Sequence, residues 1–390
     1  MGISSFASGN ELGAIGSGLS TLQPASRSRR RVLGGFALGV QRAISENSGR
    51  MVGLSKDLKS MADVNMDQAM ARRRAREAFI PIHQGLDHCL FKMDSRGIRT
   101  EESYERNSRG LEIFWKSWLP GAGVSMKGTV FFCHGYGDTC TFFFEGIAKC
   151  IAEAGYGVFA MDYPAFGLSE GLHGYIPSFD NIVDDVIEHY SKIKRRPDVK
   201  DLPHFIFGQS MGGAVALNVS LKQPQTWDGV ILVAPMCKIA EDVTPPGVVL
   251  AILNLMSKVL PEAKLFPQKD LAELAFRDLG KRKIAEYNVI SYKDQMRLKT
   301  AVELLKTTKG IESQVDKVSA PLLVLHGAAD KVTDPNVSKF LYERSRSKDK
   351  TLKLYDDSYH CILEGEPDER IFEVINDMIS WLDSHCVSKV

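Results

Sequence analysis

Three absences narrow what this chain of 390 residues is. It has no uninterrupted apolar run of about eighteen residues, the length that a transmembrane helix requires. Its seven cysteines form no C-x-x-C pair, and their odd number argues against a disulfide framework or a zinc ribbon. The net charge of +1 gives no reason to expect nucleic acid as a partner. A globular chain with free thiols in a reducing compartment is therefore expected.

Acidic residues are also scarce at the N-terminus. Residues 1–31 are rich in serine and glycine and contain a single acid, Glu11. They end in an arginine cluster made of Arg27, Arg29, Arg30 and Arg31. Leaders of this composition resemble organelle transit peptides, those of plastids especially. We expect residues 1–64 to be a plastid transit peptide or a disordered leader; the alternative location is cytoplasmic or on a membrane surface.

Residues 65–98 carry a basic helix. Between Met66 and Ile80, arginines alternate with alanines, a composition that favours helix. A basic face of this kind fits an anionic membrane surface. It equally fits a solvated linker helix, because runs of charge usually lie on exposed faces.

Beyond residue 99 the chain becomes regular. The turn-prone segment before Leu111 suggests a hairpin between residues 101–105 and 111–120. Short, continuously apolar runs then alternate with helical segments such as Phe179–Arg195. These runs are 128–135, 156–164, 204–210, 229–235 and 321–327. They predict a mostly parallel, doubly wound α/β sheet that binds its ligand at the carboxyl ends of the strands.

A helix-rich insert interrupts this alternation at residues 237–318. Its segment Gly247–Leu260 is so apolar that a helix there must be buried on most sides or face an apolar ligand. We interpret the insert as a cap over the site, with packing in the core as the simpler alternative. The core domain is then expected to comprise residues 99–236 and 319–390.

A serine enclosed by glycines lies at the end of one apolar run. Gly208 and Gly212 bracket Ser210 in the spacing G-x-S-x-G. Between a strand and a helix, this spacing forms a strained elbow that lifts the serine oxygen above the sheet. The alternative is an ordinary tight turn.

A serine nucleophile needs a base to take its proton and an acid to orient that base. Asp330 follows the apolar run 321–327, and His360 follows the next strand-like run, 351–355. The order serine, acid, histidine is the one found with such elbows. Asp334 is a second candidate for the acid, although its position before Pro335 also suits a helix cap.

Two backbone N–H groups must also face the developing negative charge. One belongs to Met211, the residue after the nucleophile. The other is expected from the loop His134-Gly135-Tyr136-Gly137, where Tyr136 is the donor by position. Gly135 and Gly137 leave room there for the substrate.

Taken together, these motifs resemble the monoacylglycerol lipase family of α/β-hydrolases, in particular its plant branch of lysophospholipase-like and caffeoylshikimate esterase-like members. The resemblance covers residues 111–390. Besides the motifs above, it rests on Asp162 with Gly167-Leu168-Ser169-Glu170-Gly171, and on His326-Gly327. It implies an α/β-hydrolase fold with a helical cap, the triad Ser210, Asp330 and His360, and a structural role for Asp162 and Ser169. Gln209 and Ala165 depart from it, because many members have histidine and glycine there.

The chemistry expected is ester hydrolysis through an acyl-enzyme on Ser210, with neither a metal nor an organic cofactor. The apolar cap favours a monoacylglycerol, which is cleaved to fatty acid and glycerol. A lysophospholipid and a caffeoylshikimate-type ester are the alternative substrates. The alternative from a different class is a ligand receptor built on a hydrolase scaffold. Peripheral membrane contact is expected through the cap or the basic helix.

Overall fold

The computed structural model describes residues 54–238, 247–265 and 271–386. Its centre is an eight-stranded sheet with the order β1-β2-β4-β3-β5-β6-β7-β8. The strands are β1 Arg99–Arg106, β2 Glu112–Leu119, β3 Gly128–Cys133, β4 Tyr156–Met161, β5 His204–Gln209, β6 Gly229–Val233, β7 Leu322–Gly327 and β8 Lys350–Tyr355. The expected hairpin is present as the antiparallel pair β1–β2, and β3 to β8 are parallel. The prediction of a mostly parallel, doubly wound sheet is confirmed.

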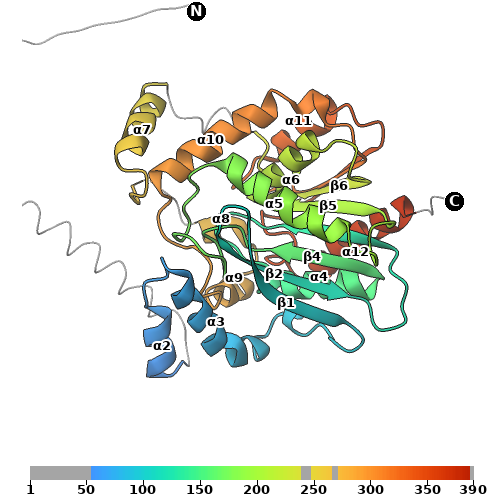
Figure 1. The fold of residues 1–390 in the computed structure, drawn as a ribbon, viewed down its shortest axis with the longest axis horizontal. Helices are drawn as coiled ribbons and strands as arrows, with labels where there is room; N and C mark the ends of the chain where they lie inside the picture. Colours follow the sequence, from blue (N-terminus) through green and yellow to red (C-terminus); the bar gives the residue numbers. More distant parts are fainter. Residues whose placement is uncertain (1–53, 239–246, 266–270, 387–390) are drawn as a thin grey trace, which may run out of the picture. The chain divides into compact units, whose positions relative to one another are not determined.

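Helices cover both faces of this sheet (Figure 1). One face carries α5 Phe179–Lys194, α6 Met211–Lys222, α10 Leu298–Glu312 and α11 Pro335–Arg344. The other carries α4 Phe143–Glu153 and α12 Asp368–His385, beside the 3₁₀ turn η1 Cys89–Phe91. The strands β3 to β7 are buried throughout because they are apolar on both sides, which is what two helical layers require.

The insert contains α7 Gly247–Val259, α8 Leu271–Ala275, α9 Leu279–Ala285, α10 and the 3₁₀ turn η3 Val315–Lys317. Of the two alternatives for its most apolar segment, burial on most sides is wrong, and an apolar ligand against it stays a prediction. In α7 only Ser257 is buried, whereas Val248 and Leu255 are 73% and 66% exposed. Figure 1 shows α7 away from the sheet and beside α10, the helix on which it packs. In the part of the chain described, no helix is both long and apolar enough to cross a membrane.

The basic segment forms α3 Ala69–Gln84, preceded by α2 Lys56–Ala62. A fully solvated linker helix does not describe it, because the face of α3 that contains Arg72, Ala75 and Phe79 is buried. Arg72 is fully buried and donates hydrogen bonds to the carbonyl oxygens of Gly167 and Ser169 at 2.5 and 2.6 Å. Arg76 forms a bidentate pair with Glu102 of β1. Three of the four arginines thus bind the protein itself, since Arg73 pairs with Glu112 of β2.

The leader prediction concerns residues 1–64, of which 1–53 lie outside the described residues. All strands of the sheet fall within 99–236 and 319–390, the ranges expected for the core. The boundaries proposed for the leader and the cap stay predictions.

Candidate active site

The serine elbow lies between β5 and α6. Ser210 has φ 54° and ψ −120°, a conformation that a residue with a side chain adopts only under strain. Neighbouring backbone explains the two glycines. A Cβ on Gly208 would lie 2.3 Å from the carbonyl oxygen of Gly212, and one on Gly212 would lie 1.8 Å from that of Cys133. Only glycine therefore lets strand and helix approach closely enough to hold Ser210 in this turn.

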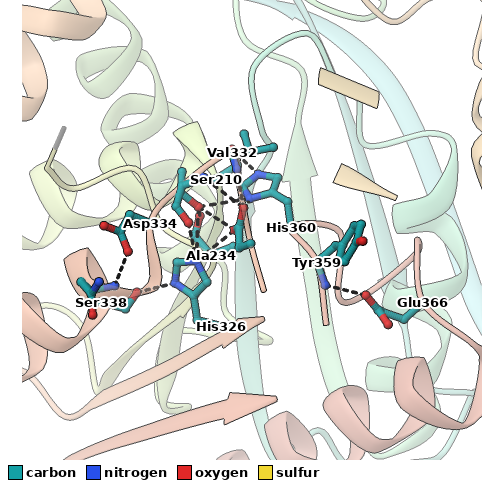
Figure 2. Close-up of polar contacts among 12 residues, drawn as sticks. Ser210, Ala234, His326, Val332, Asp334, Ser338, Tyr359, His360 and Glu366 are labelled. Atoms are coloured by element: carbon teal, nitrogen blue, oxygen red, sulfur yellow. Dashed lines mark hydrogen bonds and ion pairs between the residues drawn. The ribbon is translucent and has the colours of Figure 1, made fainter. Parts of the chain in front are cut away.

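The structure brings Ser210, His360 and Asp330 together. His360 Nε2 lies 3.0 Å from Ser210 Oγ, and His360 Nδ1 lies 2.7 Å from Asp330 Oδ2. Figure 2 shows Ser210 and His360 pointing toward one another within this network. Because Asp330 accepts the Nδ1 proton, the neutral ring exposes the Nε2 lone pair to the serine hydroxyl. This is the arrangement needed for the ring to take the hydroxyl proton.

Asp330 is held by more partners than the sequence suggested. Its Oδ1 accepts the backbone N–H groups of Val332 and Thr333 at 2.7 and 3.0 Å. Its Oδ2 also lies 3.0 Å from Nε2 of the buried His326 and 2.9 Å from the hydroxyl of Thr333. His326 was visible beforehand only as part of a family motif, and Thr333 gave no signal. Both orient the carboxylate that orients His360.

Burial and charge oppose each other in this pair. Burial disfavours the charged form of His360, but the charge of Asp330 and its hydrogen bond outweigh this effect and raise the histidine pKa. Burial likewise opposes the charge of Asp330, yet His360 and the hydrogen bonds from His326 and His360 hold its pKa well below the usual value. The acid therefore stays ionised while the base titrates.

Asp334, the second candidate for the acid, does not contact His360. Its side chain accepts the backbone N–H of Asn336 at 2.8 Å and caps α11, which begins at Pro335. The capping alternative is thus the one that the structure supports.

The loop that follows β3 lies against the nucleophile. A Cβ on Gly135 would lie 3.5 Å from Ser210 Cβ, and Gly137 has φ 79°. The imidazole of His134 is buried, donates from Nδ1 to the carbonyl of Gly135 at 2.8 Å and accepts the N–H of Tyr163 at 3.2 Å. Among the described residues, no acceptor binds the backbone N–H of Tyr136 or Met211. Both groups are thus available at the positions expected of oxyanion donors.

Asp162 and Ser169 support the loop after β4, as expected. Asp162 accepts the N–H groups of Cys140 and Leu168 at 2.8 Å, and Ser169 Oγ donates to the carbonyl of Asp162 at 2.6 Å. Ala165 in this loop has φ 70°. This left-handed conformation explains why glycine suits the position better.

A polar cluster lies beside the elbow. Gln209 donates to Glu364 Oε1 at 2.8 Å, whereas Glu364 Oε2 is buried without a hydrogen-bond partner in the described residues. Burial raises the pKa of Glu364 and raises that of Asp138 to about 7. Asn288 of the insert donates to Asp138 at 3.4 Å. Gln209, the residue before the nucleophile, is therefore paired with a carboxyl group.

Each of the seven cysteines is a free thiol, and Cys361 beside His360 is buried. Burial raises the pKa of the Cys361 thiol well above its usual value. In the ranges that the structure describes, no group of three or more His, Cys, Asp or Glu side chains is arranged to hold a metal ion.

Comparison with known proteins agrees with this geometry. A family model described as serine aminopeptidase, S33, matches residues 124–368. Caffeoylshikimate esterase from Arabidopsis thaliana is 36% identical over 290 residues, which cover 74% of this chain and 87% of that protein. Monoglyceride lipase from Mus musculus is 30% identical over 284 residues, which cover 72% of this chain and 90% of that protein.

A solved structure shares the fold. It is a soluble variant of monoglyceride lipase from Saccharomyces cerevisiae in complex with a substrate analog, with a TM-score of 0.66 at 22% identity. The match covers 76% of this chain and 98% of that chain. The family model and the two relatives confirm the resemblance drawn from the motifs. The chain belongs to the S33 serine hydrolase family of the α/β-hydrolase fold, together with monoglyceride lipases and caffeoylshikimate esterase.

Proposed function

We propose that this protein is a carboxylic ester hydrolase that cleaves monoacylglycerols to fatty acid and glycerol. The observation that carries the proposal is the continuous hydrogen-bonded path from Ser210 through His360 to Asp330, built on a strained elbow. The relatives named as monoglyceride lipases support the substrate class.

Acylation follows from this geometry. Ser210 Oγ attacks the ester carbonyl while His360 Nε2 takes the hydroxyl proton. The carbonyl oxygen becomes an oxyanion, which the N–H groups of Tyr136 and Met211 stabilise. When the tetrahedral intermediate collapses, the bond to the alcohol breaks and His360 gives its proton to the leaving oxygen. Asp330 stays ionised throughout and stabilises the imidazolium.

Deacylation repeats these steps with water. His360 takes a proton from water, the hydroxide attacks the acyl carbonyl, and the fatty acid leaves as the proton returns to Ser210. Each group ends in its starting state.

A competition experiment tests both activity and substrate. The full-length protein is labelled with a fluorophosphonate probe, and protection by monoacylglycerols, lysophospholipids and caffeoyl esters is compared. We expect labelling at Ser210 that is lost in His360→Ala and protected best by a monoacylglycerol. Stronger protection by a lysophospholipid or a caffeoyl ester would replace the substrate assignment.

The caffeoyl ester is the favoured alternative because the esterase that cleaves caffeoylshikimate is 36% identical to this chain. The alternative of a non-catalytic receptor predicts that the protein is not labelled. A folded wild-type protein that binds ligand but neither labels nor turns over ester would establish it.

The cap is proposed to contact the membrane surface. Val248, Ile252, Leu255 and Val259 are spaced to form one stripe along α7, and all four are exposed. The basic helix is not proposed for this role because three of its four arginines bind other parts of the protein. Co-sedimentation with phosphatidylcholine vesicles should fall in Leu255→Glu and stay unchanged in the control Lys56→Glu, on the exposed surface of α2. Equal sedimentation of wild type and Leu255→Glu would reject this contact.

Plastid location is proposed from the composition of the leader alone. A fluorescent fusion of residues 1–64 should accumulate in plastids. Diffuse cytosolic fluorescence would reject the proposal.

A further inference from the structure

A segment of the insert lies directly on the loop that is expected to supply an oxyanion donor. We call residues 288–297, between α9 and α10, the cap strap. The backbone N–H of Tyr292 donates to the carbonyl of Gly137 at 2.7 Å. The ring of Tyr292 packs edge-on against that of Tyr136, with centroids 5.9 Å apart. Asn288 reaches Asp138 in the same loop. The strap therefore touches three consecutive residues of the oxyanion loop.

The fit around Tyr292 is close. A Cβ on Gly137 would lie 2.7 Å from the carbonyl oxygen of Tyr292, and one on Gly174 would lie 2.6 Å from its ring. The hydroxyl of Tyr136 donates to the carbonyl of Gly174 at 3.4 Å. Because these groups are closely packed, a displacement of the cap strap also displaces the backbone at Tyr136.

Arg297 anchors the C-terminal end of the strap. Its side chain is 5% exposed and donates three hydrogen bonds to three different parts of the chain. Nε donates to the carbonyl of His173 at 3.0 Å, and Nη1 donates to that of Glu262 at 2.8 Å. Nη2 donates to Asp67 Oδ1 at 2.6 Å. Asp67 is the carboxylate of this set, so it supplies the negative charge that the buried guanidinium needs.

Asp67 lies in the N-terminal segment, outside residues 124–368 that match the family model. Its position is fixed from three sides. The N–H of Asp67 donates to Asn65, and its carbonyl accepts the N–H of His173 at 3.2 Å. The same carbonyl accepts Nη1 of Arg72, whose other nitrogens hold the loop after β4. Asp67 is thus part of a rigid support that continues from α3.

We propose that Asp67, through Arg297 and the cap strap, is a positioning residue that holds the backbone of Tyr136 in place for the oxyanion. Through this contact, the N-terminal segment contributes to catalysis. This role rests on the proposed ester hydrolysis, since an oxyanion forms only there. Hydrogen-bond donors to an oxyanion act only when they are correctly placed, and small displacements cost large factors in rate.

The test compares turnover for each active site rather than for each milligram of protein. Full-length wild type, Asp67→Ala, Asp67→Asn and the control Asp63→Asn are titrated with a fluorophosphonate. Turnover of p-nitrophenyl butyrate is then measured well below the unfolding temperature. Asp63 is exposed in the same segment and belongs to neither the strap nor the site.

We expect Asp67→Ala to lower kcat for each titrated site roughly ten-fold while KM changes less than two-fold. The rate constant of fluorophosphonate labelling should fall in parallel, because the probe's oxygen occupies the same donors. Asp67→Asn should lose less, since its amide oxygen still accepts from Arg297. Asp63→Asn should match wild type.

A purely structural role predicts a different pattern. The titrated fraction and the melting temperature of Asp67→Ala would then fall, with kcat for each site within two-fold of wild type, and the positioning role would be overturned. An equal loss in Asp63→Asn would overturn it as well. If wild type neither labelled nor turned over ester, the proposed function would fail, and the positioning role with it.

Discussion

Two helices of similar length and apolar character, α6 and α7, have opposite surroundings. In α6, nine of twelve residues are buried, whereas in α7 Ser257 alone of thirteen is buried. Helix α6 begins at the elbow and packs between the sheet and the helices α5 and α10. Helix α7 belongs to the insert and packs along α10. The apolar composition of a helix therefore does not by itself place that helix in the core.

The largest effect is expected at Ser210, the residue immediately before α6. Ser210→Ala should lower kcat by a factor of at least about 10⁴, because it removes the nucleophile. The fold should persist, since the hydroxyl is at the surface of the elbow. Turnover for each milligram and circular dichroism spectra measure the two effects. Full activity in this variant would overturn the assignment of Ser210, at the start of α6, as the nucleophile.

One substitution made in both helices tests the comparison directly. Leu217→Asn in α6 should destabilise the fold by about 3–5 kcal/mol, because a buried leucine is replaced by an unpaired amide. Leu255→Asn in α7 should change stability by less than about 0.5 kcal/mol, since that leucine is already exposed. Urea unfolding gives both values. A cost of similar size in α7 would mean that its apolar stripe is covered.

A smaller effect concerns the pH dependence of catalysis. His360 must be neutral to act as the base, so kcat/KM should fall as the pH drops through its raised pKa. The carboxyl of Glu364 contributes to raising that pKa. Glu364→Gln should therefore move the acidic limb to lower pH by less than about one unit. Leu255→Asn should leave the limb where it is, and an upward shift in Glu364→Gln would contradict this electrostatic coupling.

The smallest effect is expected at Ala165, in the loop after β4. Its φ of 70° costs about 1 kcal/mol for a residue with a Cβ, and glycine removes that strain. Ala165→Gly should therefore raise stability by up to about 1 kcal/mol. The same exchange in a helix, Ala251→Gly in α7, should lower it by about the same amount. Shifts of the melting temperature in the same direction for the two variants would refute the strain at Ala165.

Much of the site was predictable because each of its residues follows an apolar strand. Ser210, Asp330 and His360 come after β5, β7 and β8, and parallel strands bring such positions to one edge of the sheet. The supports of the triad were less visible. His326 lies inside a buried strand, and no sequence pattern around it predicts which residue it contacts. Thr333 acts through its hydroxyl and its backbone N–H. Many loop residues have such groups, so neither one predicts a role in the site.

The cap strap and Asp67 had no sequence signal at all. Asp67 and Arg297 are 230 residues apart, and each is an ordinary charged residue in its own surroundings. Their pairing depends on how the N-terminal segment and the insert dock on the loop after β4. No local pattern encodes such a contact.

The sequence alone determined the sheet, the elbow and the order of the triad, because strand hydrophobicity, glycine spacing and turn positions are local properties. The tertiary structure decided which apolar helix is buried, what the arginines of α3 bind, and what supports the oxyanion loop. These depend on contacts between distant segments, in which a charge or an apolar side chain takes its role from the surface that it meets.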